Sequence, residues 1–481
     1  MTLVAGVEVS PDHFIGGERV GSRERFVDLS PIDERPLLEV ARGGQVEADA
    51  AVAAATAAFP GWAALGPSGR AEHLHRLADL IDANVAAIAA VECADMAMLL
   101  RSLEARVIPR GARNFRAYAD LAAAYEERVW SSNGTANRVI RMPSGPAVVV
   151  TPWNAPFMLS TWKVAPALAA GSTVVLKPAE WSPLSCSLLA GLAAEAGFPA
   201  GVLNVVQGIG EEVGAALVAH PGVRRISLTG SPETGRAIAA AAARNLVPFT
   251  GELGGKGPLV VFADADVEAA ARKAAGQYDD AGQVCLAGTR LLVEESVAPG
   301  FLELFDAFVD EHVLGDPRDE STTVSPLIHR EHLERVAAFV DRARANGDEI
   351  VRGGRVAERG GLWYEPTLVV PRSNESEIVK HEVFGPVLTF QTFADEDEAI
   401  ALANSTAYGL SGIVYTGSAE RAERVGRAIR AGTVWVNTFL VRDLTAPFGG
   451  TGISGLGREG GDYALDFYSD LKTLQIRENG L

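Results

Sequence analysis

The sequence predicts an α/β protein whose parallel sheets are covered by helices on both faces. From residue 146 onward, short apolar runs alternate with longer amphipathic segments, and glycine or proline stands at many of the boundaries. Strands that read as continuous apolar runs are buried on both faces, which is typical of parallel sheets. The chain has 481 residues, more than a single hydrophobic core accommodates, so we expect two or three domains.

The segment before residue 146 is expected to form helices followed by a short β element. Ala-rich amphipathic stretches predict helices over residues 45–64, 69–90 and 112–127. The polar stretch 130–141 tolerates β structure, and its Asn133-Gly134 pair is typical of a turn between two strands.

The βα alternation falls into two series, which we expect to be two α/β units. In the first series we expect strands at 146–151, 172–177, 202–206 and 225–229, and helices at 160–170, 185–196, 211–219 and 235–245. In the second we expect strands at 258–262, 290–293, 367–370, 387–392 and 412–415. The helices of the second series are expected at 267–278, 299–312, 332–345, 396–403 and 420–431.

The charge balance restricts the class of partner. The formal net charge is −18, which argues against nucleic acid or an anionic membrane as the main partner. The N-terminal residues lack the basic and apolar regions of a signal peptide, and no stretch of about 18 apolar residues predicts a membrane span. We therefore expect a cytoplasmic protein that binds neither nucleic acid nor membrane.

The sparse cysteines argue against both a disulfide framework and a structural zinc site. The chain has Cys93, Cys186 and Cys285, and it has no CxxC pair. Cys93 and Cys186 fall on the apolar faces of predicted helices, so we interpret them as buried, inert thiols. Cys285 lies in a loop of small residues, 282–288, where a substrate could reach it. A lone cysteine of this kind is also compatible with a buried, unreactive thiol.

Two glycine-rich turns follow predicted strands. Gly208, Gly210 and Gly214 have GxGxxxG spacing, one residue longer than the common dinucleotide fingerprint, and Gly230 and Gly235 form a second turn. Glycines at such places let backbone N–H groups approach a phosphate at the start of a helix. Ordinary βα turns explain each pattern equally well.

Glu252 stands among Gly251, Gly254 and Gly255, at the end of the first α/β series. A carboxylate in such a run is not a charge on a helix surface, so it is a candidate for chemistry. The alternative is a turn residue that forms a salt bridge, for example to Lys256.

Taken together, these segments resemble the aldehyde dehydrogenase superfamily over nearly the whole chain and in the family's order. The matching blocks are Pro152-Trp153-Asn154, Thr229-Gly230-Ser231 and residues 171–178, 252–256, 282–285, 382–387, 447–450 and 454–459. Any one block is weak, but the ordered set is specific. Leu228 departs from the common Phe-Thr-Gly-Ser block. The resemblance implies two Rossmann-like parallel-sheet domains and a small β oligomerisation element.

The resemblance also implies a division of the chain. We expect an NAD-binding domain at 1–128 and 142–251, a catalytic domain at 252–462, and an oligomerisation element at 129–141 and 463–481. Residues 472–478 alternate in polarity and could add an edge strand to a neighbouring subunit. A homodimer or homotetramer is therefore expected.

The chemistry that the resemblance implies begins with attack by the Cys285 thiolate on an aldehyde carbon. The Asn154 amide and the Cys285 backbone N–H would stabilise the oxyanion. Hydride then passes to NAD, and Glu252 would activate the water that hydrolyses the thioester. A glutamate here favours release of a free acid over transfer to coenzyme A. Lys163 and Glu459 match a proposed proton relay, or they form an ordinary ion pair.

The cofactor contacts follow from the same blocks. Lys177 and Glu180 would meet the adenosine ribose, and the Glu180 carboxylate would repel a 2′-phosphate, which favours NAD over NADP. The other expected NAD contacts are Trp153, Gly210, Gly214, Gly230, Ser231, Leu253, Glu382 and Phe384. No metal is expected.

The substrate contacts are expected to include Arg110, Arg442 and Phe448. Arg442, the Pro109-Arg110 pair and Gly460-Gly461 resemble the 2-hydroxymuconic and 2-aminomuconic semialdehyde dehydrogenase branch, where two arginines hold a distal carboxylate. Alternatively, Arg442 pairs with Asp443 and never meets substrate. Two other functions stay open: a broad-specificity enzyme for apolar aldehydes, and a catalytically silent structural protein that binds the cofactor.

Overall fold

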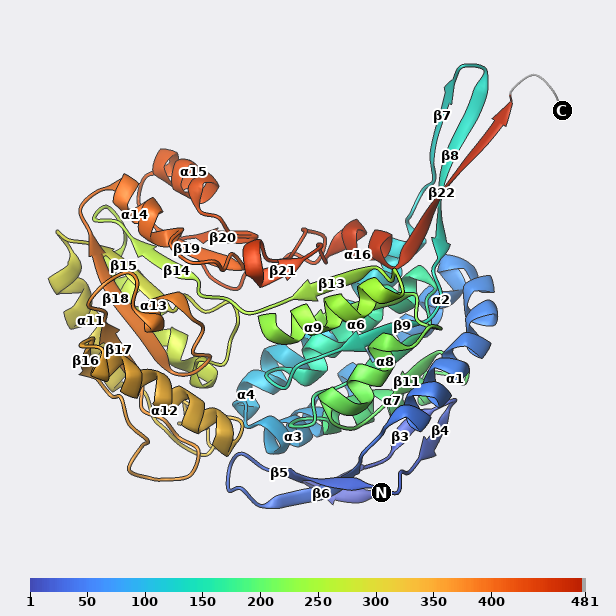
Figure 1. The fold of residues 1–481 in the computed structure, drawn as a ribbon, viewed down its shortest axis with the longest axis horizontal. Coiled ribbons are helices and arrows are strands. Elements are labelled where there is room, and N and C mark those ends of the chain that lie inside the picture. Colours follow the sequence, from blue (N-terminus) through green and yellow to red (C-terminus); the bar gives the residue numbers. More distant parts are fainter. Residues whose placement is uncertain (478–481) are drawn as a thin grey trace.

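The computed structural model describes residues 1–477 as two α/β units that lie side by side, with a narrow β arm projecting from the first unit (Figure 1). The first unit contains an eight-stranded sheet, the second a seven-stranded sheet, and the arm a three-stranded sheet. Two antiparallel ribbons at the N-terminus, β1 (Thr2–Val4) with β2 (Val7–Val9) and β5 (Arg25–Leu29) with β6 (Pro36–Ala41), pack beside the first unit.

The first sheet has the order β21-β13-β12-β9-β10-β11-β3-β4, and its five middle strands are parallel. The strands are β3 (His13–Ile15), β4 (Glu18–Val20), β9 (Ala147–Val150), β10 (Val174–Lys177), β11 (Leu203–Val205), β12 (Arg225–Thr229), β13 (Phe249–Glu252) and β21 (Gly455–Leu456).

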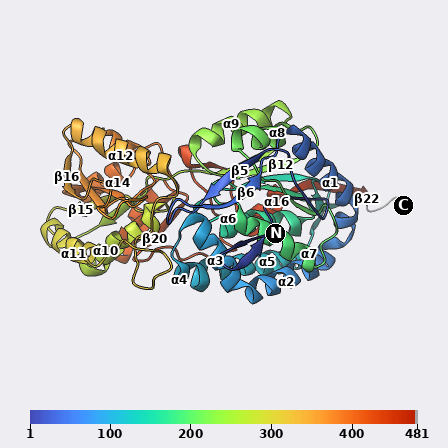
Figure 2. The same ribbon diagram turned by 90° about the horizontal axis from the view of Figure 1, so that it is seen from below.

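Helices cover both faces of the first sheet, as the continuous apolar strands predict. Val148 of β9 joins one core with α1 (Gln45–Ala64), α8 (Ala215–Ala219) and α9 (Pro232–Arg244), while its neighbours Ala147 and Val149 join the other core. That second core contains α2 (Gly66–Ala83), α3 (Val85–Met96), α5 (Ile108–Ala123), α6 (Pro156–Ala170) and α7 (Leu184–Glu195). Figure 2 shows these layers edge-on, with α8 and α9 opposite α2, α5 and α7.

The second sheet has the order β16-β17-β18-β15-β14-β19-β20. Its strands are β14 (Pro258–Val261), β15 (Arg290–Glu294), β16 (Glu349–Arg352), β17 (Thr367–Val370), β18 (Val387–Phe393), β19 (Ser411–Tyr415) and β20 (Thr433–Val436). The helices of this unit are α10 (Val267–Ala275), α11 (Ala298–Asp310), α12 (Arg330–Ala345), α13 (Glu377–Lys380), α14 (Glu396–Ala403) and α15 (Ala419–Ala428).

The arm joins two segments that lie far apart in the sequence. β7 (Arg128–Ser132) and β8 (Thr135–Pro143) form a hairpin, and both turn residues, Asn133 and Gly134, have positive φ (52° and 69°) as a tight turn of this kind requires. β22 (Ser469–Arg477), which follows α16 (Gly461–Phe467), pairs antiparallel with β8 along its whole length. The expected strand 472–478 therefore begins earlier, and Glu478 and the remaining residues of the predicted element, 479–481, lie outside the described residues.

Several predicted helices have different bounds in the structure. The helix expected at 69–90 is two helices that meet at Asn84, and the one expected at 112–127 is α5, which continues a five-residue π-helical turn, Leu103–Val107, after the short α4 (Leu100–Ser102). The helix expected at 211–219 starts as a second π-helical turn, Gly210–Gly214. α6 begins at Pro156 because proline is well accommodated in a first turn.

Within residues 1–477, no single helix is long and apolar enough to cross a membrane. The pair α1 and α2, bent by 114°, meets that test only when the two are taken together.

Candidate active site

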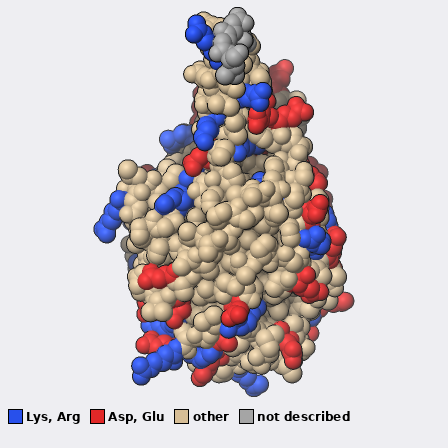
Figure 3. All heavy atoms as spheres, turned by 90° about the vertical axis from the view of Figure 1, so that its right-hand side faces the viewer, with Lys and Arg blue, Asp and Glu red and all other residues tan. Residues whose placement is uncertain are grey.

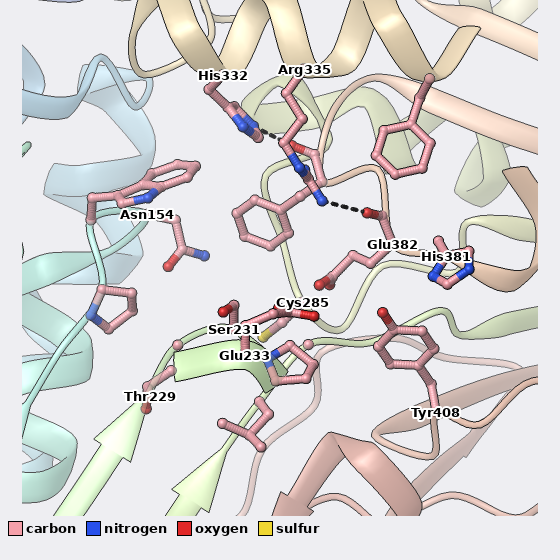
Figure 4. Close-up of a pocket in the computed structure, with 18 of the residues that line it drawn as sticks. Asn154, Thr229, Ser231, Glu233, Cys285, His332, Arg335, His381, Glu382 and Tyr408 are labelled. Atoms are coloured by element: carbon pink, nitrogen blue, oxygen red, sulfur yellow. Dashed lines mark hydrogen bonds between the residues drawn. The ribbon is translucent and has the colours of Figure 1, made fainter. Parts of the chain in front are cut away.

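A cleft of about 860 Å³ opens where the parallel strands of the first sheet end, and the second unit forms its other wall (Figure 4). The turns after β9, β12 and β13 supply Trp153, Ser231 and Leu253, and the second unit supplies Cys285 and Glu382. Ligands of open α/β sheets bind at this edge. Of the residues expected to bind or react, the cleft lining contains Trp153, Asn154, Gly230, Ser231, Leu253, Cys285, Glu382 and Phe384.

Cys285 is held at the cleft by a strained loop. Three successive residues before it, Asp280, Ala281 and Gly282, have positive φ (52°, 54° and 66°), so the chain reverses sharply after α10. A Cβ atom on Gly255 would collide with the Cys285 carbonyl oxygen, so the glycine lets the two backbones touch. Cys285 is partly exposed, whereas Cys93 and Cys186 are buried.

The Asn154 side chain is fixed beside the cysteine loop. Its Nδ2 donates a hydrogen bond of 2.8 Å to the carbonyl oxygen of Gln283, two residues before Cys285. An amide nitrogen has two hydrogens, so the second hydrogen is available to an oxyanion formed next to the sulfur.

Burial keeps the Cys285 thiol neutral at rest. The pKa of Cys285 is raised to about 12, mainly by burial of the sulfur; the carboxyl groups of Glu382 and Glu252 contribute to this rise, and the Arg442 guanidinium acts in the opposite sense. A thiol of this kind becomes a thiolate when positive charge is brought beside it.

Glu252 ends β13 with a buried carboxyl group. Neither of its oxygens has a hydrogen-bond partner among the described residues, and Lys256 Nζ likewise has none, so the salt bridge considered for this pair is not formed. Burial raises the pKa of Glu252 well above its ordinary value, the nearby Glu459 carboxylate adds to this effect, and Lys163 opposes it. A carboxyl group poised in this way suits a general base that works near neutral pH.

Lys163 and Glu459 form a buried ion pair next to Glu252. Lys163 Nζ lies 2.5 Å from Glu459 Oε1, and the Ser227 hydroxyl donates to the same oxygen at 3.1 Å. The structure thus shows an ion pair close to Glu252. This arrangement is compatible with a proton relay and with an ordinary structural ion pair.

The expected phosphate and ribose contacts lie at the same edge of the sheet. Ser231 caps α9 by accepting a hydrogen bond from the Thr234 backbone N–H at 3.1 Å, so the start of that helix faces the cleft. Lys177, the last residue of β10, forms an ion pair of 2.8 Å with Glu180. Gly210 and Gly214 lie in the π-helical turn after β11, and Gly214 packs against the Lys177 side chain. A helix start and a lysine that is ion-paired with a carboxylate together fit a dinucleotide with an unphosphorylated ribose.

The two arginines expected at the substrate end rest on aromatic rings. The Arg442 guanidinium carbon lies 3.6 Å from the centre of the Phe448 ring and 5.1 Å from that of Trp162. Arg110 lies 5.9 Å from the centre of the Trp162 ring, and its Nε donates to Asn114 Oδ1 at 3.0 Å. Neither arginine forms an ion pair within residues 1–477, and the Asp443 carboxylate accepts from Thr445 instead of Arg442.

The sequence of this chain matches one family profile over almost its full length. The profile described as the aldehyde dehydrogenase family covers residues 19–474. The chain belongs to the aldehyde dehydrogenase family. The predicted enzyme class, an NAD-linked aldehyde dehydrogenase, and the predicted fold are thereby confirmed.

Individual aldehyde dehydrogenases resemble the chain along its whole length. It is 41% identical to the 2-hydroxymuconic semialdehyde dehydrogenase of Pseudomonas sp. (strain CF600), covering 97% of this chain and 99% of the relative. It is 37% identical to the 2-aminomuconic semialdehyde dehydrogenase of Danio rerio, covering 97% and 98%. Among solved structures, P. syringae indole-3-acetaldehyde dehydrogenase in complex with NAD+ has a TM-score of 0.96 at 37% identity, with 99% of this chain and 100% of the other covered.

Some residues of the dehydrogenase cleft were not expected from the sequence. His332 and Arg335 project from α12 into the cleft (Figure 4). His332 Nε2 lies 2.8 Å from the carbonyl oxygen of Phe384, a residue held at φ +60°, and Arg335 donates to the carbonyl oxygens of Val383 and Glu382 at 2.7 and 3.0 Å. The spacing of three residues on one helix face was the available signal, but it does not distinguish a binding face from a solvated one.

Proposed function

We propose that this enzyme oxidises an aldehyde with a distal carboxylate, such as a muconic semialdehyde, to the free acid with NAD as the hydride acceptor. The observation that supports the reaction best is that Cys285 and Asn154 both line the cleft, and that Glu252, which is buried and does not line it, lies near enough to Cys285 to act on its charge. The cofactor-binding part comprises residues 1–128 and 142–251, and the catalytic part comprises residues 252–462.

The proposed reaction begins when the Cys285 thiol passes its proton to water; the thiolate Sγ then bonds to the aldehyde carbon, and the π electrons of the C=O bond move to the oxygen, which becomes an oxyanion. The Asn154 amide and the Cys285 backbone N–H stabilise that oxyanion. NAD, which Trp153, Glu382 and Phe384 of the cleft lining would hold, would supply the acceptor for the hydride that leaves the carbon with its electron pair, and Cys285 would then carry a thioester. Glu252 takes a proton from water, and the resulting hydroxide attacks the thioester carbon. The C–S bond then breaks, its electron pair leaves with Sγ as a thiolate, and the carboxylic acid is released.

The glycine-rich surroundings of Glu252 support a free acid as the product. Its carboxyl oxygens are not committed to any hydrogen bond among the described residues. They are therefore available to a water molecule. Lys163 and Glu459 lie close enough to influence the charge of Glu252, which supports a role in carrying its proton away.

The carboxylate specificity is supported by the arginines. Although the chain has a net charge of −18, the guanidinium groups of Arg442 and Arg110 form no ion pair with an acidic residue within residues 1–477. Arg442 also acts electrostatically on Cys285, so it lies near the reacting carbon. A guanidinium binds a carboxylate with two parallel hydrogen bonds, which would orient an acidic aldehyde toward the sulfur.

The proposal is tested by NADH formation with 2-hydroxymuconic semialdehyde and hexanal, using the wild type, Arg442→Ala and Cys285→Ala. We expect a preference for the acidic substrate that Arg442→Ala lowers by about tenfold or more, as loss of a charged hydrogen bond predicts. Equal loss on both substrates would favour the broad-specificity alternative. No NADH from any aldehyde of a wide panel would favour the silent structural protein.

We also propose that the arm makes the enzyme a homodimer or homotetramer. Trp130, Leu471 and Leu474 expose 38%, 58% and 39% of their surface on the arm, which is an unusual concentration of apolar side chains. Figure 3 shows the face from which the arm projects, and its central area has few charged side chains.

We also propose that the protein is cytoplasmic. A reactive thiol persists best in a reducing compartment, which supports the cytoplasm as the location.

A further inference from the structure

Trp162 lies between the two arginines proposed to bind the substrate carboxylate and the Lys163–Glu459 ion pair. It belongs to α6, directly before Lys163, and only 5% of its surface is exposed. The two arginines lie over its ring, and its indole nitrogen points toward the proton-transfer pair. A single side chain therefore contacts groups from both halves of the proposed mechanism.

The ring of Trp162 is one of the two aromatic surfaces against which the Arg442 guanidinium packs. Trp162 and Phe448 meet edge to face, with ring centres 6.4 Å apart and planes at 86°. The Arg442 guanidinium rests against both rings, at 5.1 Å and 3.6 Å. A cation over aromatic faces is held in a defined orientation without an acidic partner, so its donors stay free for a ligand.

The indole N–H of Trp162 holds the Glu459 carboxylate. Nε1 donates a hydrogen bond of 2.6 Å to Oε2, while Oε1 accepts from Lys163 Nζ at 2.5 Å and from Ser227 at 3.1 Å. Removing the indole donor would leave one oxygen of a 5%-exposed carboxylate without this partner. Such a group relaxes to a new position or binds a proton.

Two backbone hydrogen bonds link Phe448, which contacts Arg442, to Glu459, which Trp162 binds. The Phe448 N–H donates to the Glu459 carbonyl oxygen at 2.6 Å, and the Glu459 N–H donates to the Phe448 carbonyl oxygen at 2.7 Å. The residue that supports Arg442 is thus paired with the residue that Trp162 holds by its nitrogen. Movement of the indole would disturb both contacts.

We propose that Trp162 is a positioning residue for two sites at once: its ring face seats Arg442 at the distal end of the substrate, and its indole N–H fixes Glu459 beside the catalytic base. The first half rests on the proposed carboxylate specificity. The second half depends only on the aldehyde dehydrogenase reaction.

Two substitutions separate the roles. Trp162→Phe keeps an aromatic face but removes the N–H, whereas Trp162→Leu removes both. Trp363→Phe is a matched control. Trp363 is also buried, donates its Nε1–H to a backbone carbonyl at 3.1 Å and has Arg359 over its ring at 4.0 Å. It does not line the cleft.

Two quantities are measured for each variant. The first is the ratio of kcat/KM for 2-hydroxymuconic semialdehyde to that for hexanal. The second is the fraction of Cys285 present as a thioester during turnover of hexanal, obtained from the intact mass of acid-quenched enzyme, together with the rate of thioester hydrolysis in a single turnover.

We expect Trp162→Phe to keep the substrate ratio within about twofold of the wild type but to slow thioester hydrolysis roughly tenfold, so that the acyl-enzyme accumulates. Trp162→Leu should also lower the substrate ratio, and Trp363→Phe should change neither quantity. Should Trp162→Leu fail to fold, Trp162→Met tests the ring face in its place.

The proposal is overturned if Trp162→Phe hydrolyses the thioester at the wild-type rate, or if Trp162→Leu and Trp162→Met keep the wild-type substrate ratio. A wild-type enzyme without any preference for the acidic aldehyde would instead refute the carboxylate specificity. In that case the hydrolysis measurement still decides the Glu459 half.

Discussion

A Cβ atom on Gly449 would lie 2.8 Å from Oε1 of Glu252, so the buried carboxyl group occupies space that only glycine leaves open. In Gly449→Ala we expect the Glu252 side chain to move and thioester hydrolysis to slow by about tenfold or more, with NAD binding unchanged. Hydrolysis is measured in single turnovers and NAD binding by calorimetry. Gly426→Ala, on α15 with no atom within 4 Å of the added carbon, is the control. A wild-type rate of thioester hydrolysis in Gly449→Ala would contradict the proposal that Glu252 needs the space left by Gly449.

The thiol of Cys285 should respond in opposite directions to two nearby charges. The Glu382 carboxylate raises the pKa of Cys285 and the Arg442 guanidinium lowers it. Between pH 8 and 10 we therefore expect faster alkylation by iodoacetamide in Glu382→Gln, where the thiolate fraction rises, and slower alkylation in Arg442→Ala, where it falls. The modified residue is quantified by peptide mass spectrometry, with Cys285→Ala as the blank. Changes of the same sign in both variants would refute the electrostatic explanation.

Glu180 should determine the choice between NAD and NADP. Its carboxylate is held 2.8 Å from Lys177, where a 2′-phosphate would meet negative charge. In Glu180→Ala we expect the ratio of kcat/KM for NADP to that for NAD to rise about tenfold, since the repulsion disappears and Lys177 becomes free for the phosphate. Glu423→Gln, which removes an exposed carboxylate paired with Arg427 on α15, should leave the ratio unchanged.

His332 should hold the cofactor wall as a neutral donor. Burial lowers the pKa of His332 to about 4, so the ring stays uncharged from pH 6 to 9 and its bond to the Phe384 carbonyl is unaffected by pH there. We expect His332→Ala to raise the KM for NAD several-fold by the same factor across this range, and His332→Gln, which can still donate, to recover most of the loss. A KM that changes with pH only in the wild type would show that the ring titrates.

Leu474 should be essential for assembly through the arm. It exposes 39% of its surface on β22, and burial of such side chains between subunits would stabilise an oligomer. We expect Leu474→Glu to reduce the mass measured by light scattering to that of a smaller species. Val351→Glu changes a 47%-exposed valine on β16, in the second sheet, and serves as the control. A monomeric wild type would refute the proposed assembly.

The fold was predictable where local pattern and tertiary environment agree. β12 has the predicted bounds because its alternating sequence, Arg-Ile-Ser-Leu-Thr, ends at Gly230, and α14 has them because Asp395 caps its first turn. β13 was not predicted, since its sequence Phe-Thr-Gly-Glu has no apolar run and its burial comes from β12 and β21 on either side. Short strands that depend on neighbours in this way leave little trace in a sequence.

The site was predictable only as far as its motifs reach. Cys285, Glu252 and Asn154 lie in ordered blocks, whereas His332 belongs to no such block and shares the buried face of α12 with Val336 and Val340. The contact between Trp162 and Glu459 joins positions 297 residues apart. No spacing in the sequence indicates such a contact, because it depends on how α6 and the end of the chain pack together.

The short crossover after Glu252 places the two proposed catalytic groups, Glu252 and Cys285, in different α/β units. Glu252 ends a strand of the first sheet, and the chain enters the second sheet at Pro258, whose unit also holds Cys285. Widening the cleft to release reduced cofactor would therefore separate the base from the acylated sulfur. Hydrolysis of the thioester would therefore depend on the two units holding Glu252 and Cys285 together.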